Sequence, residues 1–448
     1  MKGRFNLMHK IEVKMLGPIE RCVCEINDFT VFTGPQSNGK STVAKAIYFF
    51  RTIKQDILTI MQQGGPAAVT ENKAAKWSHT LRQRLRNKFL ELFGTSWIMP
   101  LDMCMLYTFK EGIWVRVYLT EDPVNYAKNY VQVAFSEKFE DYLYDLDQQI
   151  FADMTGKQLE VKERSLTKLF DDPYETVFIP AGRNLITLLS TQLNYIFTSL
   201  ENTQLRSIDY ITRRYTELIL KLKPLFKDDY EQIIFSAEND LEQEKKYKKH
   251  KTAIRMLLER EKAILSGSYR NVDGEERLYI DQGRFVKINF ASSGQQEIVW
   301  VFNLLFYYLF EDKKVFLILE EPESHLFPDS QQGVGEILSL FANEGNQILV
   351  TTHSPYILGT FNYLLLAGQA DKTTEANVKK VLHKRYWLSP KELSAFFVSN
   401  GTLSSAVDET DNLVLIQNEL IDRASQRINE TSDSIIDFIY SEEAKEEE

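Results

Sequence analysis

The feature that most constrains the fold is the string Gly34-Pro35-Gln36-Ser37-Asn38-Gly39-Lys40-Ser41, which matches the pattern Gly-x-x-x-x-Gly-Lys-Ser/Thr. An apolar segment, Phe29 to Thr33, precedes it, and the residues from Ser41 to Arg51 carry apolar side chains at helical spacing. A strand, a glycine-containing loop and a helix in this order bring backbone N–H groups together at a helix N-terminus, where anions bind. The segment therefore predicts a phosphate-binding loop in an α/β fold.

The residue types in this loop suggest roles toward a bound nucleoside triphosphate. Lys40 would reach the β and γ phosphates, and the Ser41 hydroxyl would ligate Mg²⁺. The expected ligands are therefore ATP and Mg²⁺. The other candidate nucleotide contacts in this segment are Gly34, Pro35, Asn38, Gly39 and Thr42.

Two adjacent carboxylates follow the uninterrupted apolar segment Val315 to Leu319, which has the pattern of a strand buried on both faces of a parallel sheet. A carboxylate at the end of such a strand is costly unless a cation or a hydrogen-bond donor compensates it. Glu320 is therefore a candidate ligand of Mg²⁺, directly or through water. Glu321 is a candidate general base that polarises the attacking water, with a carboxylate in a solvated loop as the alternative interpretation.

The segment from Ser292 to Glu297 opens an apolar helix that continues to Phe310. Ser293 and Gln296 have the spacing of a capping box, which is the structural interpretation of these two residues. Capping leaves Gly294 unexplained, whereas a helix N-terminus without side-chain bulk suits an incoming phosphate. Ser293, Gly294 and Gln296 are therefore candidate contacts to a γ-phosphate.

A second buried strand, Ile348 to Thr352, ends at His353. Ligands of open α/β sheets bind at the carboxyl ends of the strands. His353 is therefore a candidate to hydrogen-bond the γ-phosphate or the attacking water. His325, in the segment after Glu321, is expected to serve a contact between subunits.

These four elements, in this order, resemble the Walker A, signature, Walker B with D-loop, and H-loop motifs of the ABC ATPase superfamily. The resemblance implies that the signature of one subunit closes over the ATP held by the other, so that ATP joins a head-to-tail dimer. Ser293, Gly294 and Gln296 would then contact the γ-phosphate bound by the partner's Lys40, and residues 324–326 would form the D-loop. The sequence departs from the family pattern in its signature, Ser-Ser-Gly-Gln-Gln, and in Glu320, which replaces aspartate.

Both departures, together with the phrase from Glu320 to Pro328, are similar to a prokaryotic branch that includes the overcoming-lysogenization-defect ATPases. The opening, Ile11 to Thr42, and the segment Phe178 to Arg183 resemble this branch as well. Its ATPases include those of anti-phage systems, first the PARIS type and then the Septu and retron-associated types. In those systems the ATPase works with a separate nuclease of TOPRIM-like or HNH type. The resemblance implies ATP-driven dimers or larger rings that sense phage DNA or a phage protein and control such an effector.

The chain divides into four parts on its sequence pattern. Residues 1–52 and 283–365 are expected to form the two pieces of one ATPase head. Residues 53–282 are expected to be a large mixed and helical insertion between Walker A and signature, with short coiled-coil-like helices at 185–265. Residues 366–448 are expected to be a helical region with an acidic tail. Within it, Asp408 to Asp411 is interpreted as a loop without the flanking strands of a nuclease domain.

Composition excludes several classes of protein. The net charge of −10 argues against a surface that binds nucleic acid all over. The 3 cysteines form no Cys-x-x-Cys pair and fit neither a disulfide scaffold nor a zinc site. No apolar signal core or membrane-spanning stretch is visible, so a cytoplasmic protein is expected.

Two other functions use the same kind of head. The first is a DNA-repair or DNA-end-processing ATPase of Rad50 and RecF type, in which basic side chains would contact phosphates. The candidates for this contact are residues 245–251 together with Arg82, Arg84, Arg86 and Lys88. The second, a motor of a membrane transporter, is disfavoured because the region between Lys40 and Ser293 is far larger than those compact motors carry.

Overall fold

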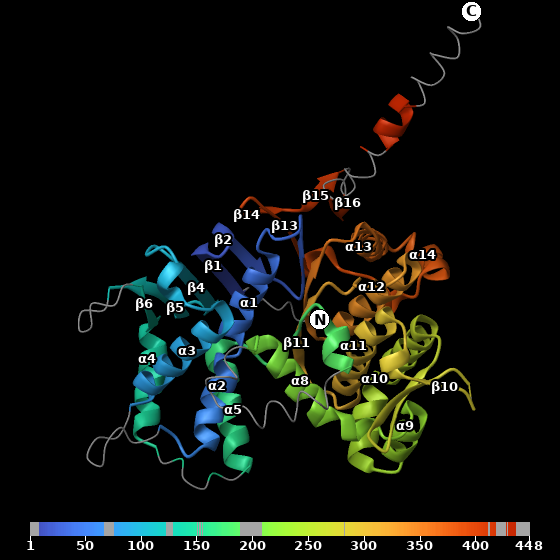
Figure 1. Cartoon of the computed structure of the whole chain (residues 1–448). Coiled ribbons are helices and arrows are strands. Elements are labelled where there is room, and N and C mark those ends of the chain that lie inside the picture. Colours follow the sequence, from blue (N-terminus) through green and yellow to red (C-terminus); the bar gives the residue numbers. More distant parts are fainter. Residues whose placement is uncertain are drawn as a thin grey trace, which may run out of the picture.

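The computed structural model of the chain describes residues 9–66, 76–121, 129–149, 151, 154, 156–188, 208–281, 283–410, 413–417, 427 and 429–435. An 11-stranded sheet crosses the molecule in the order β6-β5-β4-β1-β2-β14-β13-β3-β12-β11-β7 (Figure 1). Its strands are β1 (His9–Leu16), β2 (Ile19–Ile26), β3 (Phe29–Thr33), β4 (Cys104–Lys110), β5 (Ile113–Thr120), β6 (Tyr130–Phe135), β7 (Glu175–Ile179), β11 (Val315–Glu320), β12 (Gln347–Thr352), β13 (Leu393–Ser399) and β14 (Thr402–Ser405).

The sheet has an antiparallel half and a parallel half. Strands β6, β5, β4, β1 and β2 pair antiparallel with one another, whereas β2 pairs parallel with β14 on its other side. Strands β13, β3, β12, β11 and β7 pair parallel with one another, while β13 pairs antiparallel with β14 on its other side. Because neighbouring parallel strands end at the same edge, the loops after β3, β7, β11 and β12 lie side by side. The predicted α/β fold is confirmed.

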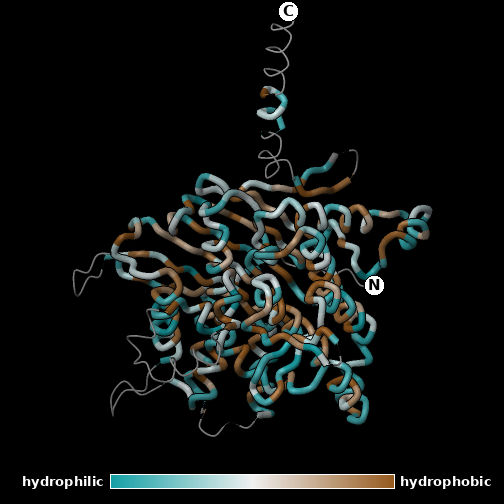
Figure 2. Tube along the Cα trace, turned by 45° about the vertical axis from the view of Figure 1, so that its right-hand side comes forward, coloured by the Kyte–Doolittle hydropathy of each residue, from teal (hydrophilic) through white to brown (hydrophobic). Residues whose placement is uncertain are grey.

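Helices cover both faces of this sheet. Along β11, Phe316 and Ile318 belong to one apolar core, while Val315, Leu317 and Leu319 belong to the other. In Figure 2 the hydrophobic segments accordingly gather inside the molecule and the hydrophilic ones outside. The first core includes α1 (Lys40–Arg51), α2 (Ile53–Gln62), α3 (Trp77–Phe93), α4 (Glu137–Asp147) and α5 (Gly156–Phe170); the second includes α8 (Tyr210–Leu222), α9 (Tyr230–Glu238), α10 (Leu241–Leu265), α11 (Ser293–Phe310), α12 (Pro328–Asn343) and α13 (Pro355–Gly368).

Smaller elements complete the described structure. A 3-stranded sheet contains β8 (Ser268–Val272), β9 (Glu275–Tyr279) and β10 (Phe285–Lys287). Helix α14 (Glu375–Val381) has no buried side chain. Helix α10, which falls in the region expected to be coiled-coil-like, buries one face against α11 and α12 as part of the core. No helix within the described ranges is long and apolar enough to cross a membrane.

The main sheet includes strands from the region that was expected to be an insertion. Strands β4 to β6 and β7 come from residues 53–282, yet they pair in the same sheet as β1, β3 and β11. Strand β7 in particular lies directly beside β11 and continues the parallel half. The inserted region therefore supplies part of the head instead of standing apart from it.

The expectation of a helical region at 366–448 is wrong between residues 393 and 416. Strand β13 pairs parallel with β3, and β14 returns antiparallel to it. Asp408 and Glu409 lie in a further strand, β15 (Val407–Thr410), which pairs with β16 (Leu413–Ile416), so the interpretation of this run as a loop is wrong too. These strands are short, and tertiary pairing decides their structure more than local sequence does. The acidic tail after residue 435 and residues 189–207 lie outside the described residues.

Candidate nucleotide site

The loop between β3 and α1 has a backbone that requires its glycines. Gly34 and Gly39 have φ angles of 133° and 101°, which side chains other than glycine rarely adopt. A Cβ at Gly34 would lie 2.3 Å from the Val398 carbonyl oxygen, and one at Gly39 would lie 2.4 Å from Ile19 Cδ1. Helix α1 begins directly after Gly39, and no side chain caps its first N–H groups. The loop therefore presents an uncapped helix N-terminus, as an anion site requires.

One further loop residue, Asn38, contacts a neighbouring hairpin. The Asn38 side-chain oxygen accepts a hydrogen bond of 3.0 Å from the backbone N–H of Asn400, at the turn between β13 and β14. Its amide nitrogen donates to the Gln36 carbonyl at 2.9 Å. The side chain of Asn38 thus braces the loop against the hairpin. Thr42, also a candidate contact, lies in the first turn of α1 and is half-buried.

Lys40 is folded back into its own loop. Its Nζ donates hydrogen bonds to the carbonyls of Gly34 and Pro35 at 2.9 and 2.8 Å, and lies 3.3 Å from His353 Nδ1. Burial lowers the pKa of Lys40 to about 8, although Glu321 and Glu323 oppose this shift. The Lys40 amine is therefore still mostly protonated at neutral pH, but it loses its proton at a lower pH than a solvated lysine does.

The affinity for ATP is expected to fall as the pH rises above about 8, because only the protonated Lys40 attracts phosphate oxygens. Since one proton is taken up on binding above that pKa, the affinity should fall by up to about tenfold per pH unit. Titration calorimetry from pH 7 to pH 9.5, roughly, measures this dependence. An affinity that stays constant over the range would contradict the assigned pKa.

Glu320 has the features of a metal ligand. Its side chain is buried at the end of β11, and this burial raises its pKa. Hydrogen bonds from Ser41 and from the backbone N–H of Ala181 act in the opposite direction and lower the pKa. The bond from Ala181 to Oε2 measures 3.3 Å, whereas the buried Oε1 has no hydrogen-bond partner. A buried carboxylate oxygen without a donor, beside a serine hydroxyl, fits Mg²⁺. Ser41 and Glu320 would hold that ion, which would neutralise charge on the phosphates.

Glu321 and His353 face each other at the same edge of the sheet. Glu321 Oε1 lies 3.5 Å from His353 Nε2, and its Oε2 accepts a hydrogen bond of 3.3 Å from the Ser324 hydroxyl. Interaction with His353 holds the pKa of Glu321 below its usual range, so the carboxylate is ionised at neutral pH. The two side chains are 37% and 31% exposed, so a water molecule can reach them. The structure thus aligns Glu321, His353 and Lys40 along the phosphate-binding loop.

Glu323 is a residue of the site that the sequence reasoning missed. Its Oε1 accepts hydrogen bonds from the Thr352 hydroxyl at 2.8 Å and from the backbone N–H of His353 at 2.7 Å. Its Oε2 is buried without a hydrogen-bond partner, and burial raises its pKa. Glu323 therefore fixes the backbone from which His353 projects. The third glutamate in Glu-Glu-Pro-Glu was the available signal.

Arg183 was also missed as a member of the site. It follows β7, and its side chain is completely buried. Its guanidinium group donates to the backbone carbonyls of Glu320 and Glu321, at 2.5 and 3.0 Å. Arg183 therefore supports the peptide units that carry both candidate catalytic carboxylates.

The helix tip at residues 292–296 differs from the expectation in two respects. The capping box is formed by Ser292 and Gln295, one residue earlier than the predicted Ser293 and Gln296. Gln296 turns inward and donates to the carbonyls of Ile288 and Ala291, both at 3.0 Å. Ser293 remains exposed at the tip. Of the predicted polar side chains, Ser293 is thus the one presented outward.

Gly294 has a structural reason within the chain. A Cβ at this position would lie 2.6 Å from the carbonyl oxygen of His325, so the segment after β11 packs directly against the helix tip. Within the described residues, no hydrogen bond or ion pair joins residues 292–296 to the loop at 34–41. The structure therefore brings together the predicted Walker residues and His353, and leaves the tip of α11 outside that group.

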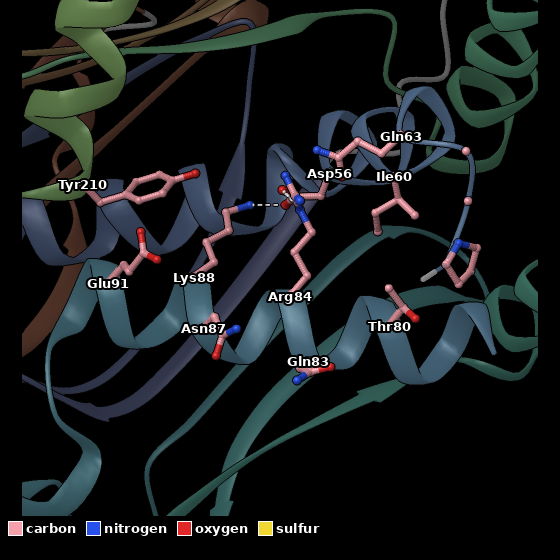
Figure 3. Close-up of a pocket in the computed structure, with 13 residues that line it drawn as sticks. Asp56, Ile60, Gln63, Thr80, Gln83, Arg84, Asn87, Lys88, Glu91 and Tyr210 are labelled. Atoms are coloured by element: carbon pink, nitrogen blue, oxygen red, sulfur yellow. Dashed lines mark hydrogen bonds and ion pairs between the residues drawn. The ribbon is translucent and has the colours of Figure 1, made fainter. Parts of the chain in front are cut away.

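A separate cavity of about 600 Å³ lies between α2 and α3, beside Tyr210 (Figure 3). Asp56 bonds to Lys88 and Arg84 across it, at 2.6 and 2.8 Å. None of the predicted site residues lines it. The cavity is therefore distinct from the group formed by the loop at 34–41, Glu321 and His353.

Comparison with known proteins identifies the family. A family model described as an AAA ATPase domain matches residues 104–358, and this chain belongs to that family. The matched stretch contains Glu320, Glu321 and His353 but starts after the loop at 34–41, which strand pairing places beside them. A search of curated proteins found no match.

Several solved structures have a related form at low similarity. An SMC head bound to the C-terminal winged-helix domain of ScpA is 12% identical, with a TM-score of 0.40, and the match covers 88% of this chain and 95% of that chain. The SMC head domain from Thermotoga maritima is 14% identical, with a TM-score of 0.35 and coverage of 89% and 97%. An SMC head with an extended coiled coil, bound to the C-terminal domain of ScpA derived from Pyrococcus furiosus, is 15% identical, with a TM-score of 0.37 and coverage of 94% and 98%. The assignment to the ATPase family therefore rests on the family model and not on these structures.

Proposed function

We propose that this chain hydrolyses ATP at a site completed by a second copy, and that it acts as a sensor and regulator in anti-phage defence. The observation that carries the ATPase proposal is the alignment of Glu321, His353 and Lys40 along the phosphate-binding loop. His353 lies 3.3 Å from the Lys40 amine and 3.5 Å from the Glu321 carboxylate. A general base, a hydrogen-bonding histidine and a phosphate-binding lysine this close together suit phosphoryl transfer to water.

Each residue has a distinct task in this reaction. The loop amides and Lys40 hold the triphosphate, and the ammonium group exchanges its bonds to the Gly34 and Pro35 carbonyls for phosphate oxygens. Glu321 is ionised and accepts a hydrogen bond from the attacking water, which orients the water toward the γ-phosphate. His353, held by Glu323, hydrogen-bonds the γ-phosphate or that water. Mg²⁺ at Ser41 and Glu320 supplies positive charge that offsets the phosphate oxygens.

Exposed side chains next to the site support self-association through ATP. Phe290 precedes the helix tip and is 76% exposed, while Phe327 follows the D-loop segment and is 72% exposed. His325, in the segment that packs against the helix tip, is about half exposed. Large apolar side chains beside an incomplete site favour contact with another protein surface. A second copy that covers Ser293 and Phe290 would supply the missing side of the nucleotide site.

The defence role rests on the resemblance of the segments Glu320 to Pro328 and Phe178 to Arg183 to the ATPases of anti-phage systems. Both segments lie at the candidate site, because Arg183 bonds to the backbone of Glu320 and Glu321. In this proposal the destructive chemistry belongs to a separate nuclease of TOPRIM-like or HNH type. A phage protein or phage DNA is the trigger, and the ATP-bound dimer holds or releases the nuclease.

The defence role predicts that a gene next to that of this chain encodes a nuclease of TOPRIM-like or HNH type, and co-expression with that nuclease tests the role. We expect the two proteins to copurify and to reduce phage plating together, because neither part is complete without the other. Lys40→Ala should remove the protection without lowering the amount of protein, as judged by immunoblotting. Full protection by this chain expressed alone would contradict the proposed division of labour.

The structure weighs against the DNA-repair alternative. The basic residues proposed to contact phosphates are largely occupied in ion pairs. On α10 these pairs are Lys246–Glu311, Lys248–Glu244, Lys249–Asp312 and Lys251–Glu238, and on α3 they are Arg82–Glu140, Arg84–Asp56 and Lys88–Asp56. The carboxylates of these pairs lower the positive charge that the two helices would offer to DNA phosphates. Tight ATP-dependent binding of double-stranded DNA that falls steeply with salt would favour the alternative instead.

A further inference from the structure

Arg183 connects three segments that are distant in the sequence. Its guanidinium group donates to the carbonyls of Pro180, Glu297, Glu320 and Glu321, at distances from 2.5 to 3.1 Å. Its Nε also lies 3.2 Å from Glu297 Oε2 in an ion pair whose two side chains are both completely buried. The backbone N–H of Arg183 donates to the same carboxylate oxygen at 3.0 Å. A single side chain thus joins the end of β11 to the first turns of α11.

Glu297 links Arg183 to the helix tip, on which it lies, and approaches the D-loop segment at His325. It lies one helical turn after Ser293, and its Oε1 is buried without a hydrogen-bond partner. The ring of His325 lies close to that oxygen, with Nδ1 at 3.6 Å. The distance is slightly too long for a hydrogen bond, and a small movement of the D-loop segment would form one. Glu297 therefore has one oxygen bound to Arg183 and one oxygen open toward His325.

The two ends of this connection belong to different nucleotide sites if the proposed ATP-joined dimer is correct, and the inference rests on that proposed function. In such a dimer, Glu320 and Glu321 act on the ATP held by their own chain. The tip at Ser293 covers the ATP held by the partner. Arg183 and Glu297 therefore lie between the catalytic carboxylates of one site and the closing surface of the other.

We propose that the buried Arg183–Glu297 pair couples the two ATP sites of the dimer, with His325 as its third member. When ATP at one site holds the tip of α11, the pair aligns the backbone of Glu321 at the other site. Separation of two fully buried charges is strongly unfavourable, so the tip and the end of β11 move together. Closure over one ATP therefore promotes hydrolysis of the second.

Mixed dimers measure this coupling directly. Intact protomers are combined with an excess of Lys40→Ala protomers, so that most dimers hold one ATP, and are compared with intact protomers alone. Hydrolysis is expressed per occupied site, after the amount of dimer in each sample has been measured by sedimentation. We expect the rate per site to be about fivefold or more higher with two ATP molecules than with one, as for a typical coupling between sites.

Glu297→Gln and His325→Asn, each placed in both kinds of protomer, should reduce this ratio to about one. Glutamine keeps the shape of Glu297 without its charge, while asparagine tolerates the left-handed backbone at His325, where φ is 58°. Because His325 is about half exposed, its variant remains informative even if the buried variant folds poorly. Glu276→Gln is the matched control, because Glu276 lies on β9 and its carboxylate forms a buried ion pair with Lys223. For this variant, the ratio of the two rates per site should equal that of the intact protein.

The outcomes separate the coupling from the proposed function. A general loss of folded protein lowers both rates and leaves their ratio unchanged, whereas loss of coupling changes the ratio. If the intact protein forms dimers with ATP but its ratio is one, or if both variants keep the ratio of the intact protein, the coupling is overturned. If the intact protein forms no dimer with ATP, the proposed function itself fails.

Discussion

Replacing Glu321 by glutamine is expected to slow ATP hydrolysis by about two to four orders of magnitude while ATP binding is retained. The interaction with His353 keeps this carboxylate ionised, and its partial exposure lets water reach it. Glutamine has nearly the same shape but accepts no proton, and Glu320 remains free to hold the metal. Phosphate release under steady-state conditions gives the rate, and titration calorimetry gives the affinity for ATP.

The matched control for this variant is Glu311→Gln. Glu311 follows α11 and forms an ion pair with Lys246, away from the loop at 34–41. Its replacement should leave the rate of hydrolysis unchanged within about a factor of two, because isolated surface pairs contribute little. Normal hydrolysis by Glu321→Gln would show that another group orients the water.

Replacing Lys40 by alanine is expected to weaken ATP binding by at least about a hundredfold, so that no hydrolysis is detected. The ammonium group is the cation at the centre of the loop, and charge-assisted hydrogen bonds to phosphate are worth roughly 1.5–3 kcal/mol each. The variant also removes the bonds that Lys40 makes to Gly34 and Pro35, which further loosens the loop. Calorimetric titration with ATP and Mg²⁺ measures the loss.

Lys14→Ala is the control for this prediction, because Lys14 lies on β1 and pairs with Asp102 at the surface. Its affinity for ATP should equal that of the intact protein. If Lys40→Ala bound ATP with unchanged affinity, the loop at 34–41 would not be the nucleotide site.

Those parts of the candidate site that depend only on a strand and the residues directly after it could be predicted from the sequence. The loop from Gly34 to Ser41 and the carboxylates after Leu319 each depend on a strand and the residues that directly follow it. Because parallel strands end at one edge, a strand pattern places the residues after it at that edge. His353 was proposed by the same reasoning, and the structure sets its Nδ1 3.3 Å from Lys40 Nζ.

The rest of the site depends on contacts that no local pattern contains. Arg183 follows a short strand in what looked like an insertion, and only the pairing of β7 with β11 brings it to Glu320. Likewise, β13 reaches the loop only because it pairs with β3. The capping box was misplaced by one residue because Ser292 and Ser293 are equally suited to cap a helix, and packing of Gly294 against His325 selects the register.

The central claim is that ATP is enclosed between two copies of the chain. Sedimentation equilibrium of Glu321→Gln, which should bind ATP without consuming it, tests this claim most directly. With ATP and Mg²⁺ we expect twice the mass of the monomer, and without nucleotide, or after Ser293→Arg at the helix tip, a single copy. A monomeric mass under saturating ATP, together with normal hydrolysis by the intact protein as a monomer, would contradict the account.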